Sequence, residues 1–345
     1  MNKFKKIGLS ALAGSLAAVS AHAGEMAVTG GLTATYAQKD GTQVGDGGKG
    51  FSTATDITFT GTAELDNGFT VSGFVTQLEG MGAVSSSQMT IDMGSLGKLK
   101  VNRVGGGAVN ALDDKLPTAW EEASDNVNHD FIGENIGSAN DDGAITYHLP
   151  ELSVDGIGTI NIGLDYDPAS GVAAGGTGST QIQATSGGGV GTGIAIQIAS
   201  DLGLNVYAGI DENENQDSSG TVGAIVKDEF NGTAGANYAY GPVTVGYQTW
   251  YNDAGLGVHY ESEGMSIAFA VNENLSVSYA QIDETKYQDG VRSANTDIEA
   301  DMKSYNVAYS MGSIAIKAHR SETGNPDFIN ATDGQMTEVS VSFAF

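Results

Sequence analysis

Alternation of apolar and polar residues, repeated in segment after segment, is the feature that most restricts the folds open to this chain. In "GTINIGLDYD", Ile160, Ile162 and Leu164 fall on one side of an extended strand, and the small and polar residues between them fall on the other. The same period of two recurs in "GIAIQIAS" (193–200), "LSVSYA" (275–280), "SYNVAYSM" (304–311) and "SIAIKAH" (313–319). This pattern predicts β-strands that each have one apolar face.

The connections between these strands alternate in length. Tight turns are expected near 66–68, 94–97, 201–203, 241–242, 272–274 and 311–313, with a somewhat longer link at 150–158. Long polar loops are expected near 38–51, 79–87, 105–141, 167–190, 211–230, 252–263, 285–300 and 321–335. Together they join sixteen strands, although "GLGVHYESE" (255–263) is an alternative strand that would change the count.

Closure of the sheet follows from its apolar faces. An even number of strands brings the final segment "TEVSVSFAF" beside the first, "MAVTGGLTATYAQ". A sheet in hydrocarbon must close because no backbone group can remain unpaired there. A soluble β-sandwich also alternates, but this chain has no second layer to cover its apolar faces. We therefore expect a 16-stranded antiparallel transmembrane β-barrel, with Phe343 and Phe345 directed toward lipid.

The N-terminus predicts export. Lys3, Lys5 and Lys6 precede a short apolar run and the small-residue sequence "AHA", which is typical of a signal peptide cut after Ala23. The run is too short for a membrane anchor. The expected organisation is a signal peptide at 1–23 and one barrel domain at 24–345. The chain has no cysteine, and its formal charge of −27 disfavours nucleic acid as a partner.

Three motifs give the chain a family resemblance: "ELDNGFTVSG" (64–73), "GSLGKLKVNRVGG" (94–106) and the terminal "VSVSFAF". It resembles the general porins of Gram-negative bacteria, specifically the alphaproteobacterial type. The resemblance implies a homotrimer in outer-membrane lipid and passive diffusion of small hydrophilic solutes and ions. It also implies that the third long loop, about 105–141, folds inward as a constriction with an acidic loop facing a basic wall.

The acidic side of this expected constriction consists of Asp113, Asp114, Glu121, Glu122 and Asp125. Such residues repel one another and favour cations in a narrow, water-filled lumen. The chain holds 42 acids against 15 bases, so we expect a cation-preferring channel. The alternative reading of these acids is an ordinary solvated outer loop.

The basic side is expected at Lys98, Lys100 and Arg103. Alternation directs Lys98 and Lys100 to the lumen, but it directs Arg103 to lipid. An arginine facing lipid at mid-bilayer costs about 2–4 kcal/mol. Either the strand has already left the membrane at this position, or a bulge near Asn102 turns Arg103 inward. The resemblance to general porins, in which a wall arginine lies at this position, implies the inward direction. Lys317 also falls on the lumenal side.

No cofactor is required for this function, although calcium is a candidate. Asp211, Asn213, Asn215 and Asp217 offer oxygen ligands at every second position, as a hard cation prefers. A solvated anionic loop is the alternative. The sequence contains no phosphate-binding G-x-x-x-x-G-K-[ST], no metal-binding H-E-x-x-H and no G-x-S-x-G motif, so we do not expect an enzyme. The competing function is a secreted or surface β-rich, adhesin-like protein without a channel.

Overall fold

A computed structural model describes residues 26–42, 47–77, 84–103, 106–125, 129–137, 144–170, 188–215, 228–253, 257–288 and 297–345. Its strands are β1 (Met26–Gly41), β2 (Gly48–Glu64), β3 (Thr70–Gln77), β4 (Val84–Asp92), β5 (Lys98–Arg103), β6 (Ile145–His148), β7 (Leu152–Val154), β8 (Gly158–Ser170), β9 (Gly188–Ala199), β10 (Leu204–Asn215), β11 (Glu229–Tyr240), β12 (Val243–Asp253), β13 (Val258–Ala270), β14 (Leu275–Gln288), β15 (Ile298–Met311), β16 (Ile314–Gly324) and β17 (Asp333–Ala344). Short 3₁₀ turns are η2 (Gly94–Leu96), η3 (Asn110–Leu112), η4 (Ile132–Glu134) and η7 (Pro326–Phe328). Within these ranges, no helix is long and apolar enough to span a membrane.

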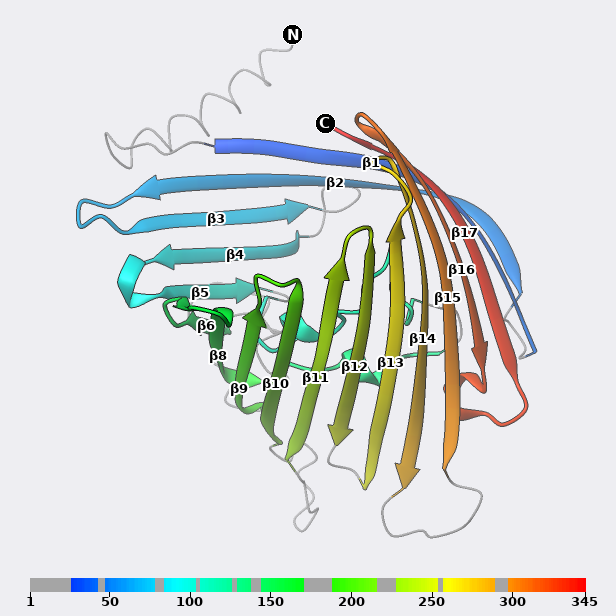
Figure 1. The fold of residues 1–345 in the computed structure, drawn as a ribbon. Helices are drawn as coiled ribbons and strands as arrows, with labels where there is room; N and C mark the ends of the chain where they lie inside the picture. Colours follow the sequence, from blue (N-terminus) through cyan, green and yellow to red (C-terminus); the bar gives the residue numbers. More distant parts are fainter. Residues whose placement is uncertain are drawn as a thin grey trace.

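The sheet closes on itself through its first and last strands. β1 pairs with β2 along one edge and with β17 along the other, and Figure 1 shows β1 and β17 side by side. The Phe345 N–H donates to the Gly30 carbonyl, and the Gly30 N–H donates to the Phe345 carbonyl, both at 2.9 Å. Each neighbouring pair of strands is antiparallel. The predicted pairing of the final strand with the first is confirmed.

Two of the seventeen segments are parts of one strand. β6 and β7 both pair with β8, and they are separated at Pro150, which has no N–H to give to a ladder. The closed barrel therefore has sixteen strands, as predicted. The link predicted at 150–158 is shorter than expected, because the strand resumes at Leu152. The Ile157 N–H then donates to the Val154 carbonyl in a tight turn.

Two predicted loops also begin or end differently. The stretch from Val258 onward does not form an extra strand; it is the start of β13, which pairs with both β12 and β14. The loop expected from residue 211 begins later, because β10 continues to Asn215. The alternation pattern therefore predicts strands that are too short at the long-loop end, where polar residues occupy both faces of the strand.

The outer face of the sheet carries the large apolar side chains. Those left exposed include Ile194, Ile196, Val206, Ile210, Val245, Ile267, Val307, Ile316 and Val341. Inward neighbours such as Gln248, Asn306 and Ser340 are polar and buried. At the end of the chain, Phe343 and Phe345 are 47% and 64% exposed. An apolar outside with a polar inside is the arrangement that a barrel surrounded by hydrocarbon requires.

Candidate functional site

Residues 106–137, between β5 and β6, lie against the inner face of the sheet (Figure 1) and are called the inner segment below. Residues 126–128 fall outside the described part. The inward-facing residues of the barrel strands are called the wall. One buried cluster joins Ala108, Val109, Leu112 and Ile136 of the segment to Ala195 and Tyr207 of the wall. A second joins Leu116, Ala123 and Phe131 to Trp250, Ala280, Ile282 and Met302. The first cluster thus packs both ends of the segment against the wall, and the second packs its middle.

Glycines of the wall make room for this packing. A Cβ atom at Gly163 would collide with the side chain of Ala108, and one at Gly246 would collide with the ring of Pro117. These two strand positions lie on β8 and β12, so the close approach occurs at widely separated parts of the wall. Larger residues there would push the inner segment further into the lumen.

Polar side chains of the wall hold the backbone of the segment. The carboxylate of Asp165 on β8 accepts hydrogen bonds from the N–H groups of Ala108 at 2.8 Å and Val109 at 2.9 Å. On β12, the side-chain oxygen of Gln248 accepts from the Lys115 N–H at 2.8 Å, and its nitrogen donates to the Leu112 carbonyl at 2.7 Å. The segment has little regular structure, so its backbone groups depend on such partners.

Glu284 on β14 is a further wall group that holds the inner segment. Its side chain is completely buried, and one carboxylate oxygen accepts from the N–H groups of Ile132 at 3.0 Å and Gly133 at 3.1 Å. The other oxygen lies 2.9 Å from Nε2 of His129. Nδ1 of His129 accepts from the Asp327 N–H at 3.0 Å, so Nε2 carries the proton that is donated to Glu284. The pair ties the inner segment to β14 and to η7.

The five acids predicted for the constriction all lie on the inner segment, and its contacts place them near one another. Carboxylate oxygens of Asp114, Glu122 and Glu134 lie within 4.8 Å of one another. Asp113 is electrostatically coupled to this trio, and Glu121 hydrogen-bonds with Asp125. Glu134, far from Asp114 along the chain, was not among the predicted site residues. Its proximity depends on how the segment folds back, which no local motif signals.

Burial and mutual repulsion change the protonation of this cluster. Burial, with repulsion from Glu122 and Asp113, raises the pKa of Asp114 to about 7. Burial and the same neighbouring charges raise the pKa of Glu134 to about 8, against the opposing hydrogen bond from Ser124. The pKa of Glu122 is also raised, mainly by burial. The cluster therefore gains negative charge as the pH rises through neutrality.

The predicted basic residues Lys98 and Lys100 share the inner face of β5 with Asn102. Nζ of Lys98 lies 3.2 Å from Oδ2 of Asp92. The predicted bulge at Asn102 is wrong: β5 pairs with β4 without a shift as far as Arg103, and Gln88 donates to Oδ1 of the inward-facing Asn102 at 2.8 Å. The backbone of Arg103 thus occupies an outward register position, and its side chain falls outside the described part.

A further base and acid face the inner segment from the last two strands. Nζ of Lys317 on β16 lies 5.6 Å from the ring centre of Trp120, which confirms its lumenal direction. Burial, with Asp125 and Glu338 on β17, raises the pKa of Glu121 to about 7, and the charge of Lys317 opposes this shift. Glu338 was not predicted as a site residue. It lies in the closing strand, whose place beside the segment depends on closure of the barrel.

The residues predicted to hold calcium lie partly on β10. Asp211 is buried, and its carboxylate accepts from the Gly137 N–H at 2.7 Å and from the Asn231 side chain at 3.2 Å. Asn213 is also on β10, while the side chain of Asn215 and all of Asp217 fall outside the described residues. Asp211 thus anchors the end of the inner segment. The calcium site itself stays a prediction.

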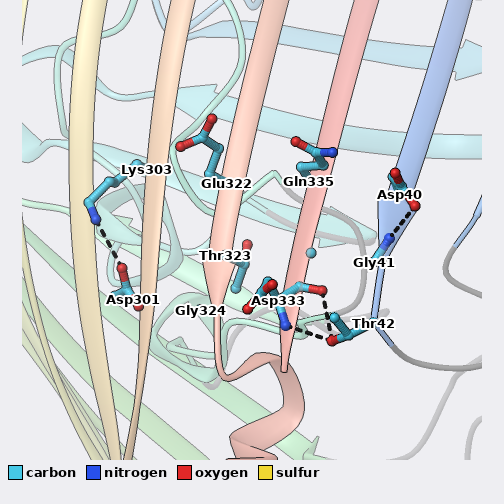
Figure 2. Close-up of a pocket in the computed structure, with 11 residues that line it drawn as sticks. Asp40, Gly41, Thr42, Asp301, Lys303, Glu322, Thr323, Gly324, Asp333 and Gln335 are labelled. Carbon is cyan, nitrogen blue, oxygen red and sulfur yellow. Dashed lines mark hydrogen bonds and ion pairs between the residues drawn. The ribbon is translucent and has the colours of Figure 1, made fainter. Parts of the chain in front are cut away.

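A separate pocket of about 430 Å³ lies at the long-loop end of β1, β15, β16 and β17. Figure 2 shows Lys303 paired with Asp301, at 3.1 Å, and Glu322 and Gln335 on neighbouring strands. Lys303 and Asp301 share the outward face of β15 with the exposed Tyr305. The pocket therefore belongs mainly to the outer surface and lies apart from the inner segment.

Comparisons with known proteins identify a family from the sequence and similar folds among solved structures. A family model described as Gram-negative porin matches residues 8–310. The fold is similar to an anion-selective porin from Comamonas acidovorans (TM-score 0.66, 13% identity, covering 93% of this chain and 99% of that one). It is also similar to OmpF of Salmonella typhi (TM-score 0.67, 12% identity, covering 93% of this chain and 98% of that one). A third similar structure is OmpT of Vibrio cholerae (TM-score 0.62, 11% identity, covering 94% of this chain and 99% of that one). No curated protein matches the sequence.

Proposed function

The chain belongs to the Gram-negative porin family, and from this premise we propose that it is a cation-preferring channel for passive diffusion of small hydrophilic solutes. The family and the closed barrel place it in the bacterial outer membrane. The preference for cations over anions needs evidence beyond the family and the fold. The anion-selective porin of Comamonas acidovorans shares the fold at 13% identity, so the fold alone does not decide the sign.

The acid cluster of the inner segment is the observation that carries the cation preference. Wall side chains such as Gln248 and Asn306 hold the backbone beside Asp113 and Glu121, so the carboxylates project from an anchored segment. Charges of one sign in a narrow lumen with low-dielectric walls concentrate the opposite ion. We propose that the segment narrows the lumen and that its acids set the charge preference, by local electrostatics without bond chemistry.

A fourfold neutralisation tests this assignment. Replacing Asp113→Asn, Asp114→Asn, Glu121→Gln and Glu122→Gln together should lower the cation-to-anion permeability ratio, obtained from reversal potentials in planar bilayers. The matched control neutralises four acids of the outward face: Glu261→Gln, Glu263→Gln, Asp283→Asn and Glu299→Gln. This control should leave the ratio near that of the unmodified protein. If the fourfold variant of the inner segment has an unchanged permeability ratio, the acid cluster does not line the constriction.

Three further expectations stay predictions: a signal peptide at 1–23, a homotrimer and a bound calcium ion. The signal peptide lies outside the described residues, and the trimer follows from the resemblance to general porins. For calcium, the trio Asp114, Glu122 and Glu134 is a second candidate beside Asp211, because its oxygens approach within 4.8 Å. A chelator that changes neither the stability nor the conductance of the protein would argue against calcium.

A further inference from the structure

A cavity of about 870 Å³ lies inside the barrel at its short-turn end. Gly94 and Gly97 of the turn before β5 line it, as does Pro150 at the interruption between β6 and β7. Ala108 lines the side toward the inner segment. If the protein is a channel as proposed above, a solute passes this cavity on one side of the inner segment.

Nitrogen-bearing side chains from two adjacent strands face the cavity. Lys98 on β5 lies directly opposite His148 on β6, and Lys100 lies two residues further along β5. Asp92 pairs with Lys98, but the ammonium group of the half-buried Lys100 has no hydrogen bond or ion pair within the described part of the chain. Nε2 of His148 is buried and likewise has no partner there. These groups are available to a ligand.

No described acid forms an ion pair that neutralises the positive charge of Lys100. The charge of Asp165 stabilises that of Lys100, but both carboxylate oxygens of Asp165 accept N–H groups of the inner segment. Among the described residues that line the cavity, Glu151 is the one carboxylate, and it is exposed. The inner part of the cavity therefore has an excess of positive charge.

Two amide side chains complete the lining. Asn161 on β8 and Gln197 on β9 are direct partners in the ladder and both face the cavity. An ammonium group, an unpaired imidazole nitrogen and two amides offer several hydrogen-bond donors. Anionic oxygens are the groups that such donors bind most strongly.

We propose that this cavity binds the oxyanion group, a carboxylate or a phosphate, of a small solute in transit. The site rests on the proposed channel function, and it is separate from the acid cluster, whose wall anchor Gln248 is on β12 rather than β5. A solute that carries both charges would meet carboxylates at the inner segment and Lys100 in the cavity. The channel would then favour cations overall while holding anions at one site.

Single-channel recording tests this site with defined probes. Potassium succinate and potassium phosphate are added separately, at constant ionic strength, to each side of a bilayer that carries the protein in KCl. At least one probe should reduce the current saturably, and the two arms distinguish carboxylate from phosphate binding. The half-effect concentration is the probe concentration that gives half of the maximal reduction in current. In Lys100→Met it should rise about tenfold or more, as expected for losing a hydrogen bond to a charged group. His148→Gln should weaken the effect as well.

Lys303→Met is the matched control, because Lys303 lies on the outer face and the change removes the same charge. It should leave the half-effect concentration unchanged. A conducting protein with no saturable response to either probe would overturn the oxyanion site but not the channel. Equal responses in the unmodified protein, Lys100→Met and His148→Gln would also overturn it. Absence of conductance from folded protein would instead contradict the proposed function.

Discussion

Asp114 and Glu134 retain protons at a pH where exposed carboxyl groups are ionised. Their pKa values, about 7 and about 8, are raised first by burial and then by the charges of neighbouring acids, including Glu122 and Asp113. The negative charge of the inner segment is therefore adjustable within the physiological range. Lys115 opposes the shift at Asp114, but its attraction ranks below burial and repulsion.

The cation-to-anion permeability ratio should rise as the pH increases from about 5.5 to 9, because Asp114 and Glu134 lose their protons in that interval. Reversal potentials recorded across this range measure the effect. The double variant Asp114→Asn with Glu134→Gln should flatten the profile. Glu261→Gln with Glu263→Gln, on the outer face, should preserve it. A ratio of the unmodified protein that stays constant across the range would contradict the shifted titration.

At the scale of the element, the inner segment holds its course through the wall. Its 3₁₀ turns η3 and η4 are too short to position it alone, and its backbone groups bind Asp165, Gln248, Glu284 and Asn306. An N–H group left buried without an acceptor costs about 1–3 kcal/mol. Together with Asp211 and the apolar clusters, these four wall side chains determine where the segment lies, and thereby where its acids project.

Replacing Glu284→Ala should release the segment near η4, because the N–H groups of Ile132 and Gly133 and the ring of His129 lose their shared acceptor. We expect a lower midpoint of thermal unfolding in detergent and larger fluctuations of the open-channel current. Asp283→Ala is the control, since Asp283 is the neighbouring residue on the outer face of the same strand. Similar behaviour of the two variants would show that Glu284 does not anchor the segment.

The strand faces could be predicted because alternation is local: each run such as 160–166 shows its apolar side without reference to the rest of the chain. Closure also followed, since an even strand number brings Phe345 beside Gly30. The anchors could not be predicted. Gln248 and Lys115 are 133 residues apart, and nothing near either signals the contact. The bulge expected at Asn102 was wrong because the neighbouring strand β4 stays in register.

At the scale of the whole molecule, the protein separates apolar from polar residues across the sheet and the acid cluster from the bases of β5 within the lumen. Large apolar residues predominate on the outer face, and the inner face is mainly small or polar except where it packs against the inner segment, so the closed barrel meets hydrocarbon and water at once. Within the lumen, the acid cluster of Asp114, Glu122 and Glu134 lies on the inner segment, and the bases Lys98 and Lys100 lie on β5. The excess of 42 acids over 15 bases in the chain supports the cation preference that we propose.

The reversal potential of the purified protein in a planar bilayer, under a KCl gradient at neutral pH, tests this account most directly. A cation-preferring channel makes the dilute side positive, because potassium crosses faster than chloride. That sign, with a stable conductance, is the predicted result. A negative dilute side would show that the bases control the narrowest part of the lumen, contrary to the role assigned to the acids. Folded protein without conductance would contradict the channel itself.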